Sequence, residues 1–111
     1  MSRRWTLEAA RAILPDVRRR TAQAVERVEA LGERMRAEAP DSEQRRELEQ
    51  QITRQVSRWL RSMEALGVVV KGAWLVDFDT GSGYLCWRWP EERLEYFHGY
   101  DEGFAGRARI Q

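Results

Sequence analysis

The periodicity of apolar residues changes once along this chain, at Gly67, and this change constrains the fold more than any other feature. Before Gly67, apolar side chains recur at alternating steps of three and four residues, the spacing that holds one stripe of a helix against a partner. After it they alternate with polar residues, as in strands. The chain is therefore expected to be an α+β domain, helical over residues 1–67 and an antiparallel sheet with a C-terminal turn over residues 68–111.

Two helical stripes precede Gly67, and Pro40 separates them because proline cannot continue a helical hydrogen-bond ladder. The first stripe consists of Leu14, Val17, Thr21, Ala24, Val28, Leu31 and Met35. The second consists of Leu48, Ile52, Val56, Trp59, Met63 and Leu66. Gly67 is suited to end the second helix as a cap. Two long helices joined by a short turn predict an antiparallel hairpin.

A separate short helix is expected in front of the hairpin. Thr6 is a suitable N-cap, because its hydroxyl can accept a hydrogen bond from a free N–H of the first turn. Glu8 would lie at the positive end of the helix dipole. Pro15 disfavours helical geometry at Leu14 and has no N–H, so a break or kink is predicted there, with Pro15 opening the next helix.

The region after Gly67 is expected to form a three-stranded antiparallel sheet that packs against the hairpin. With TGSG (80–83) and PEER (90–93) as loops, Asp79 faces Tyr84 and Trp89 faces Leu94. Cross-strand neighbours share a face. One face is then nearly all apolar and consists of Trp74, Val76, Phe78, Leu85, Trp87, Trp89, Leu94, Tyr96 and His98. The other consists of Leu75, Asp77, Tyr84, Cys86, Arg88, Glu95 and Phe97, with Arg88 opposite Glu95. A shift of one residue in either register would mix the two faces.

Length and composition indicate one soluble domain spanning residues 1–111. The 111 residues are too few for two independently folding domains. No apolar run is long enough to span a membrane, and the N-terminus has no apolar core of a signal peptide, so a cytoplasmic location is expected. The single cysteine, Cys86, excludes an intramolecular disulfide and agrees with a reducing compartment.

Several segments resemble a bacterial family that is catalogued only as a domain of unknown function, number 2203. These segments are LVDF, LCWR and HxxDEGFAGR in the second half of the chain, and WTLEAARAILP near its start. The C-terminal motif is the most specific of them. The connections before LVDF and between DF and LCWR are shorter here than in the usual pattern of the family. The resemblance implies an architecture and assigns no reaction.

The segment HGYDEGFAGR, residues 98–107, contains the best candidates for a site. His98, Asp101 and Glu102 are nitrogen and oxygen ligands that could meet on one divalent metal ion if the segment turns tightly. A wider ligand site would add Arg107, Asp77 and Arg88, and the predicted register also brings Asp77 opposite Cys86. The structural alternative is that His98 donates to a backbone carbonyl while Asp101 and Glu102 cap the turn.

Other chemistries have weaker support in the sequence. EGFAGR could cradle an anion under Arg107, or it could be a bend that buries Phe104. Cys86 lacks a basic neighbour that would make it a nucleophile, and we expect a buried apolar role for it. The RRR run at residues 18–20 suggests nucleic acid, but Glu26, Glu29 and Glu33 follow on the same helix. Such interleaved charges are typical of a solvated surface, so nucleic-acid binding is not expected.

The leading functional hypothesis is a non-catalytic, self-associating interaction or scaffold protein. A lone helical hairpin leaves apolar positions without a partner, so a homodimer or a dimer of dimers through the long helices is expected, with a coiled-coil type of packing. The alternative is a small metal- or ligand-binding protein, conceivably an enzyme, with its site around HGYDEGFAGR. No catalytic residue is assigned, and a divalent metal ion is the only cofactor considered.

Overall fold

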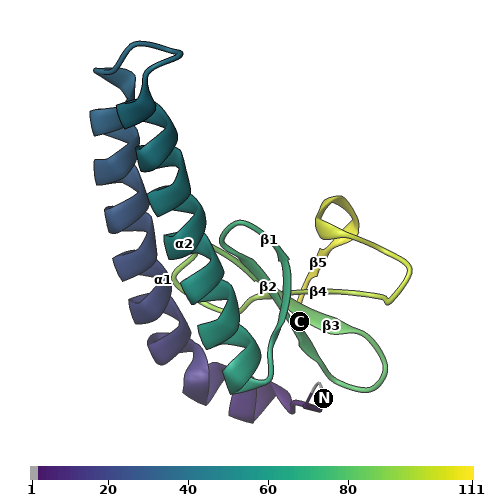
Figure 1. Ribbon diagram of the computed structural model, residues 1–111. Coiled ribbons are helices and arrows are strands. Elements are labelled where there is room, and N and C mark those ends of the chain that lie inside the picture. Colours follow the sequence, from purple (N-terminus) through teal and green to yellow (C-terminus); the bar gives the residue numbers. More distant parts are fainter. Residues whose placement is uncertain (1–2) are drawn as a thin grey trace.

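Two long helices form an antiparallel hairpin, as the apolar stripes predict. The structure, a computed structural model, describes residues 3–111. Helix α1 spans Leu7–Arg36 and helix α2 spans Glu43–Leu66 (Figure 1). The Thr6 hydroxyl accepts from the N–H of Ala9, and Gly67 ends α2 in the left-handed conformation. No helix in this part of the chain is long and apolar enough to cross a membrane.

The expected short N-terminal helix is the first part of α1, because the helix continues through Pro15. Proline inside a helix costs about 3 kcal/mol and leaves the carbonyl of Arg11 without its usual partner. The buried side chains of Ala10, Leu14 and Val17 lie on both sides of Pro15 and belong to the same core. Their common packing holds the segment helical, and the first turns of α1 are inclined to the rest of the helix in Figure 1.

The sheet has five antiparallel strands, whereas the sequence analysis predicted three. The strands are β1 (Val69–Gly72), β2 (Leu75–Asp79), β3 (Tyr84–Arg88), β4 (Tyr96–His98) and β5 (Ala108–Arg109), and they are neighbours in that order. Strand β1 turns into β2 through Trp74, which has a φ of +64°. A tryptophan in this conformation is rare, so sequence patterns do not indicate a turn there.

The predicted register between β2 and β3 is confirmed, but that between β3 and β4 is wrong by one residue. Asp79 pairs with Tyr84 as expected. Tyr84 pairs with His98 and Cys86 with Tyr96, which moves Tyr96 and His98 to the face of the sheet that contains Asp77 and Cys86. Arg88 pairs with Leu75, and Glu95 instead forms an ion pair with Arg109.

The register differs because residues 89–95 form a longer loop than PEER. Leu94 is buried in the core, and its carbonyl accepts from the guanidinium of Arg11. The backbone N–H of Arg88 donates to Glu91 Oε1 at 2.8 Å, so β3 ends before Trp89. Leu94 therefore fills the core from a loop, and Trp89 and Leu94 do not pair as strand residues.

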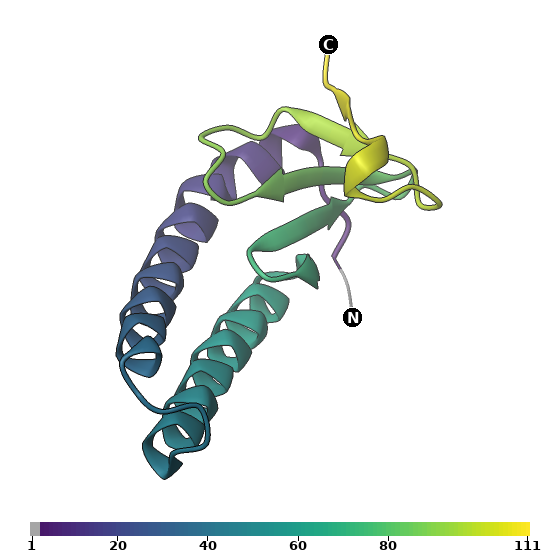
Figure 2. The ribbon, with the colours of Figure 1, turned by 90° about the horizontal axis from the view of Figure 1, so that it is seen from above.

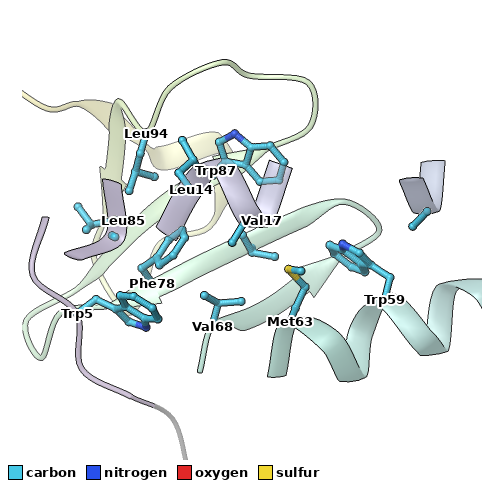
Figure 3. Packing of buried hydrophobic residues seen from close by; sticks show 13 residues of the cluster. Trp5, Leu14, Val17, Trp59, Met63, Val68, Phe78, Leu85, Trp87 and Leu94 are labelled. Carbon is cyan, nitrogen blue, oxygen red and sulfur yellow. The ribbon is translucent and has the colours of Figure 1, made fainter. Parts of the chain in front are cut away.

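The core lies between the base of the hairpin and one face of the sheet (Figure 3). Trp5 contacts β2 and the end of α2 there. Its backbone N–H donates to the carbonyl of Asp79 at 2.7 Å, and its indole Nε1 donates to the carbonyl of Gly67 at 3.0 Å. Its ring packs edge-on against Phe78. Farther up the hairpin, the indole Nε1 of Trp59 donates to the buried Thr21 hydroxyl at 2.9 Å.

Replacing Trp5 with Ala should lower the free energy of unfolding by about 3–5 kcal/mol, because it removes a fully packed aromatic side chain and leaves a cavity. Urea unfolding followed by circular dichroism measures the change. The matched control is Phe97→Ala, since Phe97 is 46% exposed and its loss should cost less than about 1 kcal/mol. Equal losses for the two variants would contradict this description of the core.

Candidate functional site

Three chemically reactive side chains meet on the face of the sheet that is turned away from the helices. Asp77 in β2 lies directly opposite Cys86 in β3. His98 in β4 pairs with Tyr84 and so lies diagonal to Cys86 on the same face. Asp77, Cys86 and His98 are buried, with exposed fractions of 1%, 1% and 3%, and their candidate ligand atoms all lie within 4.8 Å of one another.

His98 and Asp77 form a buried hydrogen bond. His98 Nε2 lies 2.9 Å from Asp77 Oδ2, and His98 Nδ1 lies 2.9 Å from the carbonyl oxygen of Gly99. A carbonyl can only accept, so we assign a hydrogen to Nδ1. The contact between Nε2 and Oδ2 then needs a second proton, which the pair shares. Burial raises the pKa of Asp77 above its ordinary value, partly offset by the charge of His98, and so favours this protonated pair.

Cys86 is a thiol in this environment. Burial, followed by the negative charge of Asp77, raises the pKa of Cys86 to about 12, although Arg107 acts in the opposite direction. A thiol with such a pKa is a poor nucleophile at neutral pH. A metal ion changes this, because coordination removes the thiol proton.

One polar atom of the cluster, on Asp77, has no hydrogen-bond partner in the described part of the chain. Asp77 Oδ1 is buried and makes no hydrogen bond of normal geometry within residues 3–111. Buried carboxylate oxygens without partners are rare, since each one costs desolvation energy. Asp77 lines a cavity of about 70 Å³ together with Cys86 and His98. This volume accommodates an ion with a water molecule, whereas an organic substrate is too large for it.

The C-terminal turn covers this cavity. Glu102, Gly103 and Phe104 line it from the turn, and Lys71 and Leu75 line it from β1 and β2. The turn consists of η1 (Phe104–Gly106) and the residues before it, and it is the yellow segment that precedes β5 in Figure 1. Glu102 Oε1 accepts from the N–H of Gly99 at 2.9 Å and holds the turn closed.

Arg107 fastens the turn to the sheet. Its guanidinium lies 4.0 Å from the ring centres of both Tyr96 and Phe104 and forms an ion pair with Glu91. Its Nη1 also lies 4.0 Å from Cys86 Sγ. Arg88 is exposed, and its guanidinium carbon lies 5.1 Å from the ring centre of Phe104.

The structure separates the residues that the sequence analysis grouped in one segment. His98 and Asp77 are in direct contact, and Cys86, which was not among the expected ligands, completes their cluster. Asp101 is exposed at the tip of the turn. Glu102 reaches the rim of the cavity while its carboxylate caps the turn. The pairing of Asp77 with Cys86 was visible in the β2–β3 register, but the one-residue error in β4 put His98 on the opposite face.

A second buried carboxylate, Asp79, accepts three hydrogen bonds through one of its oxygens. Asp79 Oδ1 accepts from the hydroxyl of Tyr100 at 2.6 Å, from the N–H of Gly81 at 2.9 Å and from Arg4 Nη1 at 2.9 Å. The hydrogen bond from Tyr100 contributes most to lowering the pKa of Asp79. Because these three hydrogen bonds explain the buried carboxylate, we assign Asp79 to stability: it joins Arg4, β2 and the C-terminal turn.

Replacing Asp79 with Asn should destabilise the protein by about 1 kcal/mol at pH 7, because charged hydrogen bonds become neutral ones. The pKa of Asp79 is lowered on folding, so its ionised form stabilises the fold above the unfolded pKa of about 3.9, and this contribution is lost as the pH falls through the folded value. The difference in the free energy of unfolding between wild type and variant, measured with urea, should therefore become smaller below about pH 4. Asp101→Asn is the control, and an undiminished difference for Asp79→Asn at acid pH would contradict the assignment.

The chain was compared with known proteins. A family model described as "Uncharacterized conserved protein (DUF2203)" matches residues 3–110, nearly the whole chain. No curated protein and no solved structure matches it significantly.

Proposed function

The chain belongs to the DUF2203 family of uncharacterised conserved proteins, and we propose that it binds a divalent transition-metal ion through Asp77, Cys86 and His98. The observation that carries this proposal is the meeting of an oxygen, a sulfur and a nitrogen ligand within 4.8 Å in a buried site. Thiolate and imidazole favour zinc and its neighbours in the transition series, whereas magnesium and calcium prefer oxygen ligands. Zinc is the expected ion.

The geometry of the cluster is close to what zinc requires. Ligand atoms on a tetrahedral zinc ion lie about 3.3–3.8 Å apart, so a contraction of about 1 Å brings these three side chains to bonding distance. The hydrogen bond from His98 Nδ1 to the carbonyl of Gly99 would orient the imidazole, as carbonyl groups commonly do for zinc-bound histidines. The cavity beside Asp77 leaves room for a water molecule as the fourth ligand.

The metal would replace two protons. One is the proton shared by Asp77 and His98, and the other is the thiol proton of Cys86, whose pKa of about 12 keeps it bound at neutral pH. Asp77 Oδ1, which has no hydrogen-bond partner within residues 3–111, would gain an electrostatic partner in the ion. The cost of burying this carboxyl group is then offset by metal binding. A reducing compartment such as the cytoplasm would keep Cys86 available as a ligand.

Isothermal titration with zinc chloride should give one ion per chain for the wild type, and Asp77→Asn should weaken binding by about 100-fold or more. Asn is a poor metal ligand, but its amide can still donate to His98 Nε2, so the fold should survive, which circular dichroism checks. Asp101→Asn makes the same chemical change in the exposed carboxylate of the C-terminal turn and should bind zinc like the wild type.

Proton release provides a second readout of the same experiment. Titrations in buffers of different ionisation enthalpy should report about two protons released per zinc ion for the wild type and about one for Cys86→Ser. The proposal would be wrong if the wild type bound no zinc at micromolar concentrations. It would also be wrong if Asp101→Asn weakened binding as much as Asp77→Asn, because the ligands would then lie in the turn.

A second proposed role is non-catalytic self-association through the helical hairpin. The hairpin extends well beyond the sheet (Figure 2), and the central core reaches only to Ala24 in α1 and Trp59 in α2. Beyond these residues, Val25 and Leu48 are buried, but Val28, Leu31 and Ile52 remain only partly buried. In this part of the hairpin each helix packs, among the described residues, only against the other helix. A second copy of the hairpin would cover the apolar side chains that remain partly exposed.

Light scattering coupled to size exclusion should therefore give about twice the 13.1 kDa mass of one chain at tens of micromolar protein. Leu31→Arg should shift the mass to that of the monomer, because a charge at the new interface would lack a partner. Near-UV circular dichroism should stay unchanged, since the tryptophans of the core lie at the other end of the hairpin. A monomeric wild type would contradict this role without affecting the metal-binding proposal.

A further inference from the structure

A large cavity lies between α1 and the loop that joins β3 to β4. Its volume is about 520 Å³, far larger than the cavity at Asp77 and in the range of small-molecule sites. Its apolar wall is formed by Leu14 and Pro15 of α1 and by Leu94 of the loop. Leu14 and Leu94 belong to the core, so this wall is a rigid part of the fold.

Two arginines of α1 line the cavity and are held in place by backbone carbonyls. Arg11 donates through Nε and Nη2 to the carbonyl of Leu94 at 3.3 and 3.2 Å. Arg18 donates through Nε to the carbonyl of Glu91 at 3.0 Å, and its guanidinium lies over the ring of Trp89. Within residues 3–111, both terminal nitrogens of Arg18 and Nη1 of Arg11 make no hydrogen bond and are available to a ligand.

No carboxylate of the described residues neutralises the charges of these arginines. Neither Arg11 nor Arg18 forms an ion pair within residues 3–111, because their partners are carbonyl oxygens. Arg93 adds a third positive charge to the lining. Glu92 and Glu95 also line the cavity, but Glu95 is paired with Arg109. The free charge around the cavity is therefore positive and suits an anion.

The spacing of the two arginines favours a ligand with two anionic groups. Residues seven apart lie on the same side of a helix after about two turns, and the helical rise separates Arg11 and Arg18 by about 10 Å along the axis. Leu14 and Pro15 lie between them. A guanidinium group recognises a carboxylate through parallel hydrogen bonds, and the apolar wall suits an aliphatic chain.

We propose that this cavity binds an aliphatic dicarboxylate, with one carboxylate on Arg18, the other on Arg11 and the chain against Leu14, Pro15 and Leu94. This site is separate from the proposed metal site, because the cavity at Arg11 and Arg18 shares no lining residue with the cavity at Asp77, Cys86 and His98. Arg18 contributes most to the binding energy, because its two terminal nitrogens can donate two parallel hydrogen bonds to one carboxylate.

Suberate is the probe, and its binding is measured by isothermal titration. Suberate should bind about tenfold or more tightly than succinate, which is too short to reach both arginines, and than hexanoate, which has one carboxylate. Arg18→Gln and Arg11→Gln should each weaken suberate binding by about tenfold or more. Arg27→Gln, an exposed arginine farther along α1, should not change it.

Three outcomes would overturn the proposal: no suberate binding at millimolar concentration, equal binding of suberate and hexanoate, or unchanged binding by the double variant Arg11→Gln/Arg18→Gln. Asp77→Asn, which removes a proposed metal ligand, should bind suberate like the wild type. The dicarboxylate site and the metal site therefore succeed or fail separately. Near-UV circular dichroism of each variant shows whether the core around Leu94 is intact.

Discussion

The contacts of Glu91 hold the sheet, α1 and the C-terminal turn together, and the arrangement of the rest of the molecule depends on them. Its carbonyl accepts from the indole Nε1 of Trp87 at 2.8 Å and from Arg18 Nε at 3.0 Å, so it joins the sheet to α1. Its carboxylate accepts from the backbone N–H of Arg88 and ion-pairs with Arg107, so it also ends β3 and anchors the C-terminal turn. One residue of a loop thereby connects β3, α1 and the C-terminal turn.

The consequence of these contacts is the register of β4. Because β3 ends at Arg88 and Leu94 enters the core from the loop, His98 pairs with Tyr84 and faces the same side as Asp77 and Cys86. A shift by one residue would turn His98 toward the helices and separate the three side chains. Arg107, stacked between Tyr96 and Phe104, then closes the turn over the cluster. The candidate metal site is thus a result of loop geometry and not of a compact sequence motif.

Burying the cluster of Asp77, Cys86 and His98 costs free energy as long as no ligand is bound. Asp77 is desolvated, one of its oxygens has no hydrogen-bond partner within residues 3–111, and its other oxygen shares a proton with His98. Replacing such a group with an apolar one often makes a protein more stable, so its presence calls for a functional explanation. Asp79 provides the contrast within the same strand, since its oxygen contacts with Tyr100, Gly81 and Arg4 explain it by stability alone.

Sequence patterns predict the α+β class, the helical hairpin, the caps at Thr6 and Gly67, and the β2–β3 hairpin with Asp79 opposite Tyr84, and the structure has all of them. These features follow from local physics: apolar periodicity, capping by hydroxyl and glycine, and alternation across a short turn. Local patterns do not predict that α1 continues through Pro15, that Trp74 occupies a turn, or that His98 meets Cys86. Each of these depends on side chains from distant elements, such as Leu94 in the core and Glu91 against Arg18 and Arg107, whose combined packing outweighs the local preference of the chain.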